Sequence, residues 1–329
     1  MKTYTLLFLF FIQLPLISNA QNEFRIAFGS CNRQNRPQPL WDNILNDQPD
    51  LWIWLGDNIY GDSHDMTVLK NKYELQRSNP DYQKIMSNVP IVGIWDDHDY
   101  GKNDGGKDFS QKRRSQKLLL DFLGEPMGTA RRKRAGIYTA YQYKAGDKTI
   151  KLILLDGRFH RDKVRKKNGT YVPNPKGDIL GEQQWKWLEA QLKNSTADVH
   201  IIASGIQVIA EDHGYEKWAN FPRSRQRLFN LLTRTKPKGV IFLSGDRHIG
   251  DFSKVSLPGL DYPVYDITSS GLTHSSTNIS SEPNRHRSGL FVNQKHYGLL
   301  TLKDEGEKTS VEVSLKGDEE TFHTERYRF

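Results

Sequence analysis

Carboxylates, histidines, a tyrosine and a thiol gather in four short polar segments of this 329-residue chain, each directly after an apolar run. The side chains that could do chemistry there are those of Cys31, Asp57, Tyr60, Asp96, Asp97, His98, Asp99, Asp246 and His248. In α/β folds, ligands bind at the carboxyl ends of strands. These side-chain types are common metal ligands. The pattern therefore predicts a metal site at the edge of a sheet.

Asp57 follows Gly56 at the end of the apolar run 52–55. A carboxylate there can bridge two cations, because each of its oxygens can bind one. Tyr60 can supply a phenolate to an acidic metal, whose charge lowers the pKa of the phenol. The alternatives are a turn or helix-cap acid for Asp57 and ordinary packing for Tyr60.

Residues 96–99 place four ionisable side chains in a row. Their like charges repel unless a positive charge lies among them. Asp97 is a candidate metal ligand, and His98 would then act as a general acid or hold charge on the leaving oxygen. The alternative is an exposed acidic turn.

Asp246 and His248 are separated by one residue after the apolar run 240–244. On an extended segment both would face the same side, where they could bind two neighbouring metals. Arg247 would then face away, toward a supporting partner. The alternative is a β-turn with an ordinary surface histidine.

Two metals about 4 Å apart would each bind a phosphate oxygen and generate hydroxide for in-line attack. Arg158 follows another apolar run, and its guanidinium suits a phosphate oxygen; the alternative is a solvated charge in a basic loop. Cys31 is the one cysteine, so no internal disulfide forms. It is either a small buried apolar residue or a metal-bound thiolate.

Apolar runs alternate with helical spacing along the chain, and a hairpin turn is expected at 145–147. This alternation predicts a mixed α/β protein with two sheets. The segments 158–178 and 269–295 are expected to be long loops beside the site. The expected strands are 24–29, 51–55, 91–95, 138–143, 148–155, 199–203, 240–243, 252–256, 264–267, 296–302 and 310–315, and the expected helices are 40–45, 68–77, 111–123, 182–192 and 225–233.

The N-terminus is typical of a secretory signal peptide over residues 1–20, because Lys2 precedes an apolar stretch and small residues follow at 18–20. A retained anchor is the alternative. We expect an exported protein, periplasmic or extracellular, with one domain over 21–329 and no membrane-spanning segment after cleavage. The net charge is +8, but the basic clusters 131–134 and 158–167 lack a nucleic-acid recognition motif. We expect solvated side chains at 131–134.

Five motifs, taken together, resemble those of the PhoD-type alkaline phosphatases, which belong to the calcineurin-like metallophosphatase superfamily. They are GSC at 29–31, GDNIY at 56–60, WDDHD at 95–99, LDGR at 155–158 and GDRH at 245–248. The resemblance covers roughly residues 24–270. It implies a four-layer α/β/β/α sandwich with two mixed sheets, without the extra N-terminal β domain of many members. It also implies hydrolysis of phosphate monoesters, and often diesters, with Fe³⁺ and one or two Ca²⁺ ions.

The same resemblance implies roles for single residues. Cys31, Asp57, Tyr60 and His248 would hold the iron, and Asp57, Asp97 and Asp246 would hold calcium. His98 matches the catalytic histidine, and Arg158 matches the motif residue that we expect to contact phosphate. Other divalent metals are alternatives.

Three functions follow from these expectations. The first is a secreted, monomeric phosphomonoesterase that acts on small phosphate esters. The second is a phosphodiesterase or phospholipase-C-like enzyme with the same chemistry. The third is a non-catalytic binding protein on the same scaffold.

Overall fold

Two six-stranded mixed sheets pack face to face in the computed structural model, which describes residues 22–329. The first sheet has the order β14-β13-β12-β1-β2-β3, with β1, β2 and β3 parallel and the other pairs antiparallel. Its strands are β1 (Glu23–Gly29), β2 (Leu51–Leu55), β3 (Ile91–Ile94), β12 (Tyr297–Glu305), β13 (Lys308–Lys316) and β14 (Thr321–Arg328).

The second sheet has the order β10-β11-β9-β8-β5-β4. Its central strands β11, β9, β8 and β5 are parallel, and an antiparallel strand closes each edge. Its strands are β4 (Thr139–Ala145), β5 (Lys148–Leu154), β8 (Val199–Ser204), β9 (Val240–Ser244), β10 (Gly250–Val255) and β11 (Val264–Ser269).

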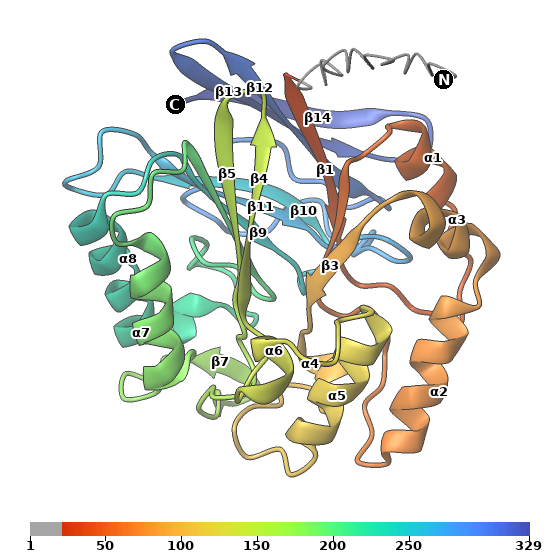
Figure 1. Cartoon of the computed structure of the whole chain (residues 1–329). Coiled ribbons are helices and arrows are strands. Elements are labelled where there is room, and N and C mark those ends of the chain that lie inside the picture. The colour runs from red at the N-terminus through yellow and green to blue at the C-terminus, as the bar shows by residue number, and fades with distance from the viewer. Residues whose placement is uncertain (1–21) are drawn as a thin grey trace, which may run out of the picture.

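Helices cover the outer face of each sheet, so the molecule has four layers (Figure 1). Helices α7 and α8 lie against the second sheet, and α1 and α3 lie against the first. No helix within residues 22–329 has the length and apolar character needed to cross a bilayer. The helices are α1 (Trp41–Asn46), α2 (Met66–Arg77), α3 (Pro80–Asn88), α4 (Asp97–Tyr100), α5 (Lys112–Phe122), α6 (Ala130–Lys133), α7 (Gly181–Leu192), the 3₁₀ helix η1 (Trp218–Asn220) and α8 (Pro222–Thr235).

Alternation along the strands builds two separate cores. In β9, Ile241 and Leu243 face the core between the sheets, whereas Val240 and Phe242 face the core under α7 and α8. Both faces of this strand are buried, so it is apolar throughout, as is usual for parallel strands covered on both sides. The prediction of an α/β fold with two mixed sheets is confirmed.

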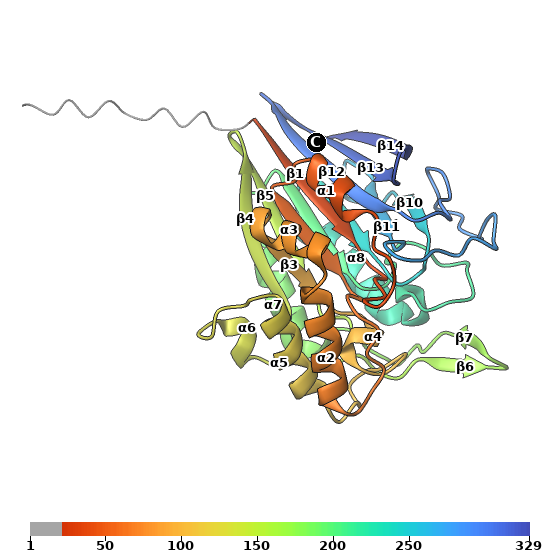
Figure 2. The same cartoon turned by 90° about the vertical axis from the view of Figure 1, so that its right-hand side faces the viewer.

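The segment 158–178 differs from the expected loop. It contains a two-stranded hairpin, β6 (Arg165–Lys167) and β7 (Thr170–Val172). This hairpin projects from the body of the protein (Figure 2). Its turn is at Asn168-Gly169, and both residues have positive φ, as a two-residue hairpin turn requires.

Candidate metal centre

The four predicted polar segments meet at the carboxyl ends of strands from both sheets. Cys31 follows β1 and Asp57 follows β2, while Asp97 opens α4 just beyond β3. Asp246 and His248 follow β9 in the second sheet. Ligand atoms of Cys31, Asp57 and His248 all lie within 4.8 Å of one another. Residues far apart in the chain therefore form one cluster.

Two carboxylates connect this cluster to further groups. Asp57 also lies within 4.8 Å of Asp97 and His98, and Asp97 lies equally close to Asp96 and Asp246. Asp57 therefore stands between a set with sulfur and nitrogen donors and a set with carboxylate oxygens. This is the place that a bridging ligand needs.

Tyr60 completes the sulfur- and nitrogen-containing side. Its hydroxyl is 3.0 Å from His248 Nε2 and 3.0 Å from Nε2 of His274. The two histidine Nε2 atoms are 3.2 Å apart. Cys31 Sγ is 3.4 Å from Asp57 Oδ2 and 3.0 Å from Ser270 Oγ.

The backbone adopts the left-handed region at four of the predicted ligands. The φ angles are +60° at Cys31, +51° at Asp57, +69° at Asp246 and +56° at His248. Non-glycine residues rarely have positive φ. The expectation that Asp246 and His248 lie on an extended segment is therefore wrong. They lie on a turn, and they fall into different ligand groups.

Gly56 is required where β2 turns into Asp57. Its φ is +98°, and a Cβ atom added there would lie 2.5 Å from Cβ of Asp96. The close approach of these two backbones brings the Asp57 segment against the Asp96–Asp97 segment. Glycine is the residue that meets both demands.

Asp99 holds the two ligand segments together from behind. Its buried carboxylate accepts hydrogen bonds from the backbone N–H groups of Asp57 (3.2 Å), Asn58 (3.3 Å) and Asp96 (2.7 Å). Asp96, Asp97 and Asp99 are all buried. The alternative of an exposed acidic turn at 96–99 is therefore wrong.

The electrostatics of the cluster favour a cation. Burial and the nearby Cys31 raise the pKa of Asp57 well above its usual range. Burial, with Asp96 and Asp97 close by, raises the pKa of Asp246 to about 8. Burial raises the pKa of the Cys31 thiol to about 11. Ionising these groups together is unfavourable unless positive charge lies among them.

One buried oxygen of the cluster has no hydrogen-bond partner among the described residues. Asp97 Oδ1 is buried and accepts no hydrogen bond within residues 22–329, whereas its Oδ2 accepts the backbone N–H of Asp104 at 2.8 Å. A buried, unpaired carboxylate oxygen is costly, and a cation would satisfy it. Thiolate, phenolate and imidazole donors suit a transition metal, and carboxylate oxygens suit a hard cation such as calcium. The residues present therefore fit a metal centre.

His98 lies at the mouth of the cluster with its ring fixed on two sides. Its Nδ1 is 2.7 Å from Asp62 Oδ2, and its ring packs against Tyr60 with centroids 4.2 Å apart. Burial alone would lower the pKa of His98, but the hydrogen bond to Asp62 and the charges of Asp57 and Asp97 raise it to about 10. The carboxylates around His98 therefore favour the protonated ring.

Arg158 lies behind the cluster. Its side chain is fully buried, and its Nε and Nη2 donate to the two oxygens of Asp96, each at 2.7 Å. Its Nη1 donates to Glu216 at 2.9 Å. The partners that the structure gives Arg158 are therefore carboxylates, and Asp96 directly precedes the ligand Asp97.

Three residues of the site carried no signal in the sequence. Asp62, Ser270 and His274 contact His98, Cys31 and Tyr60 respectively. Each lies in a polar loop, where single Asp, Ser and His residues are common. Only the folded arrangement reveals them.

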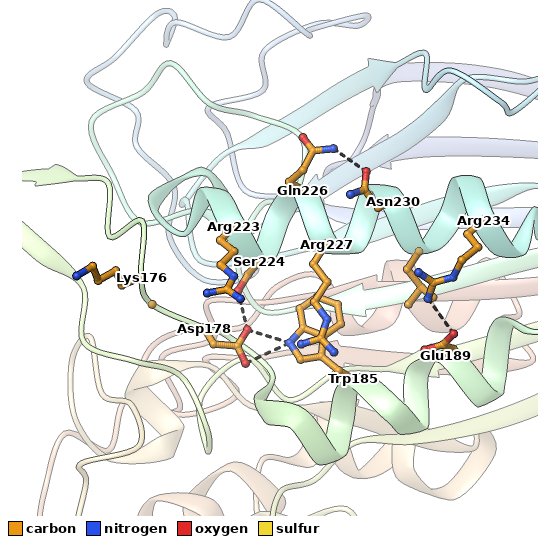
Figure 3. Close-up of a pocket in the computed structure, with 12 residues that line it drawn as sticks. Lys176, Asp178, Trp185, Glu189, Arg223, Ser224, Gln226, Arg227, Asn230 and Arg234 are labelled. Atoms are coloured by element: carbon orange, nitrogen blue, oxygen red, sulfur yellow. Dashed lines mark hydrogen bonds and ion pairs between the residues drawn. The ribbon is translucent and has the colours of Figure 1, made fainter.

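A cavity of about 390 Å³ opens in front of the cluster. Its lining includes Asp97, His98, Asp246 and His248. A larger cavity of about 820 Å³ lies elsewhere, between α7 and α8 (Figure 3). There Asp178 accepts hydrogen bonds from Trp185 and Ser224. No predicted ligand lines the larger cavity, so the smaller one is the candidate active site.

Comparison with known proteins agrees with this geometry. A family model described as PhoD-like phosphatase matches residues 26–311. Alkaline phosphatase D of Bacillus subtilis (strain 168) is 23% identical over 300 residues, which cover 76% of this chain and 51% of that protein. The chain thus spans about half the length of this curated relative.

Two solved structures share the fold. A structure of PhoD superposes with a TM-score of 0.75 at 19% identity, covering 89% of this chain and 65% of that one. A dimetal phosphatase from Danio rerio superposes with a TM-score of 0.54 at 14% identity, covering 92% and 98% of the two chains. Both likenesses support a metallophosphatase-like arrangement of the two sheets.

Proposed function

The chain belongs to the PhoD-like phosphatase family, and from that premise we propose that it hydrolyses phosphate monoesters at the cluster around Asp57. One observation carries the proposal. Donor atoms from three separate strand ends, those of Cys31, Asp57 and His248, lie within 4.8 Å of one another. They do so beside an open cavity that His98 also lines. His98 and the donor residue His248 thus line the same cavity.

The proposed metals are iron and calcium. Cys31, Asp57, Tyr60 and His248 would hold Fe³⁺, because sulfur, phenol and imidazole donors gather on that side. Asp57, Asp97 and Asp246 would hold Ca²⁺ through carboxylate oxygens. When bound, such ions would polarise a phosphoryl oxygen and lower the pKa of a water molecule, so that this water could act as the nucleophile near neutral pH.

The side chains supply the remaining steps. His98 is oriented by Asp62 and Tyr60, and in its protonated form it would protonate the leaving oxygen of the ester. Arg158 is a positioning residue, since it anchors Asp96 directly before Asp97.

We also propose that the protein is exported. The signal peptide predicted over residues 1–20 lies outside the described residues. N-terminal sequencing of the protein released by its native host tests this, and we expect the mature chain to begin at Gln21.

Replacing Asp57 by Asn tests the proposed function. Asparagine lacks the negative charge and one of the two oxygens that would hold the metals, so we expect bound metal to fall and kcat for an aryl phosphate to drop about 10³-fold, the equivalent of about 4 kcal/mol of lost charge stabilisation. Asp42→Asn is the matched control, because Asp42 is exposed on α1 and Lys84 is its ion-pair partner among the described residues. Near-normal turnover by the Asp57 variant would refute the proposal. A bis-aryl phosphodiester assayed in parallel separates monoesterase from diesterase activity.

A further inference from the structure

Arg247 lies between the two ligand candidates Asp246 and His248, and its side chain lines the cavity in front of the cluster. It is the single Arg or Lys among the described residues that line this cavity. The other lining groups are acids, histidines, neutral polar side chains and the two tyrosines Tyr171 and Tyr215. Arg247 is therefore the one permanently charged cationic side chain among the described residues that line this cavity.

The guanidinium of Arg247 is held in a fixed orientation. Its Cζ lies 3.7 Å from the centroid of the Tyr215 ring, and its Nη2 donates to the buried carboxylate of Glu282. Stacking and a charge-assisted hydrogen bond together fix the plane of the group. Its binding geometry is thus preorganised before a ligand arrives.

Arg247 keeps unused hydrogen-bonding capacity. The side chain is 7% exposed, and its Nε is buried with no partner within residues 22–329. A guanidinium has five N–H donors, and Glu282 is the one carboxylate that pairs with it in the described chain. Nη2 is the guanidinium nitrogen that donates to Glu282, so other N–H groups of Arg247 remain for an anionic oxygen of a ligand.

A second basic side chain, that of the buried Lys217, lies behind Tyr215. The ammonium group of Lys217 donates to the backbone oxygens of His213 and Tyr215. In the described chain it pairs with no carboxylate, so Glu282 does not cancel the charge of both Lys217 and Arg247. Lys217 therefore places positive charge close to Arg247, whereas Glu216 beside it is paired with Arg158 and Arg161.

The position of His98 indicates which part of a substrate reaches Arg247. His98 lines the same cavity, and under the proposed function it protonates the leaving oxygen. The alcohol part of the ester must then occupy this cavity. Resting on that function, we propose that Arg247 binds a second anionic group, phosphate or carboxylate, carried by the alcohol part of the substrate. The preferred substrates are then small phosphate monoesters with such a group.

Matched substrates test the proposal. Propane-1,3-diol monophosphate, propane-1,3-diol bisphosphate and 4-phosphooxybutanoate differ in whether the far end is neutral, phosphate or carboxylate. After correction for its two equivalent ends, we expect the bisphosphate to exceed the monophosphate about tenfold in kcat/KM, which is the value of one hydrogen bond to a charged group. Comparing 4-phosphooxybutanoate with the bisphosphate shows whether Arg247 prefers a carboxylate or a phosphate at the far end.

Variants of Arg247 should change the ratio of kcat/KM for the bisphosphate to kcat/KM for the monophosphate, and not merely the rate. Arg247→Gln should bring the ratio close to one, and Arg247→Lys should keep part of it because the charge remains. Arg234→Gln is the matched control, since Arg234 pairs with Glu189 and lines the other cavity (Figure 3). It should leave the ratio unchanged. Equal losses for all three substrates in Arg247→Gln, or an equal fall of the ratio in Arg234→Gln, would overturn the proposal.

Binding measurements on the wild type separate this inference from the proposed function. Calorimetry with propylphosphonate and propane-1,3-diyl bisphosphonate needs neither turnover nor a variant that folds. We expect the bisphosphonate to bind about tenfold more tightly. Absence of all ester hydrolysis would refute the function, whereas equal affinities of the two phosphonates would refute the role of Arg247.

Discussion

The Arg158→Met variant should be less stable to unfolding than the wild type, because two buried carboxylates lose this partner. Arg158 is fully buried and donates two hydrogen bonds to Asp96 and one to Glu216. Asp96 and Glu216 are buried as well. Methionine fills much of the volume but leaves both carboxylates without this partner.

The magnitude follows from the burial of the pair. Breaking a buried ion pair by removing one partner costs about 3–5 kcal/mol, because an uncompensated charge remains. Even with Arg158 present, burial raises the pKa of Asp96 to about 6. Glu216 keeps a second partner, since Arg161 Nη1 lies 3.0 Å from its Oε1. We therefore expect a loss near the lower end, about 3 kcal/mol.

Urea unfolding at pH 7.5 provides the measurement. Arg227→Met is the matched control, because Arg227 also donates two hydrogen bonds to one carboxylate, that of Glu182, but on the exposed face of α8. Exposed pairs contribute about 0–1 kcal/mol, so the control should unfold almost like the wild type. An Arg158 variant with unchanged stability and a hundredfold lower kcat/KM would refute this reasoning and place Arg158 on the substrate.

Two further outcomes follow from the site and from the core. Tyr60→Phe should abolish any visible tyrosinate-to-iron absorption of the purified protein while other bound metal remains by elemental analysis; an unchanged spectrum would remove Tyr60 from the iron. His200 is buried, its Nδ1 donates to the Lys238 carbonyl at 2.6 Å, and burial lowers its pKa to about 4. Since the unfolded chain takes up this proton near pH 6.5, stability present above pH 6.5 is lost as the pH falls toward 4, by about 3 kcal/mol. His200→Gln should flatten that part of the curve of unfolding free energy against pH, and an unaltered slope would contradict the assignment.

The ligand candidates could be read from the sequence because each directly follows a strand with a strong apolar signal. The runs 51–55 and 240–244 are buried at every residue. A polar side chain just after such a run must lie at the sheet edge. Their position just after these runs therefore places Asp57 and Asp246 at the sheet edge without knowledge of the tertiary structure.

Elements at the surface gave weaker patterns. Strand β14 is an edge strand with charged, partly exposed side chains, so its apolar alternation is faint. Helix α3 depends on a cap, in which Asn79 accepts the N–H groups of Asp81 and Tyr82 and Pro80 opens the helix. Both elements went unpredicted because tertiary contacts and capping, rather than periodicity, define them.

The basic cluster 131–134 shows the limit of reading charge from sequence. We expected solvated side chains there, but Arg131 is buried and donates to the carbonyls of Gly93 and Ile137. Its salt bridge with Glu125 adds a third contact. The local sequence does not distinguish an arginine that donates to buried backbone carbonyls from one that is solvated.

The left-handed backbone at the ligand positions connects the fold to the chemistry. Cys31, Asp57, Asp246 and His248 all have positive φ, and such conformations cost of order 1–3 kcal/mol each in non-glycine residues. A strand that simply continued would carry each side chain past the sheet edge. A left-handed residue turns the chain at that edge, so that ligands from β1, β2 and β9 point toward one another. The energetic cost of the left-handed conformation at Asp57 is offset by the hydrogen bonds that Asp99 accepts from the backbone N–H groups of Asp57 and Asn58. What these turns achieve is the convergence of ligand atoms from separate strands within 4.8 Å of one another.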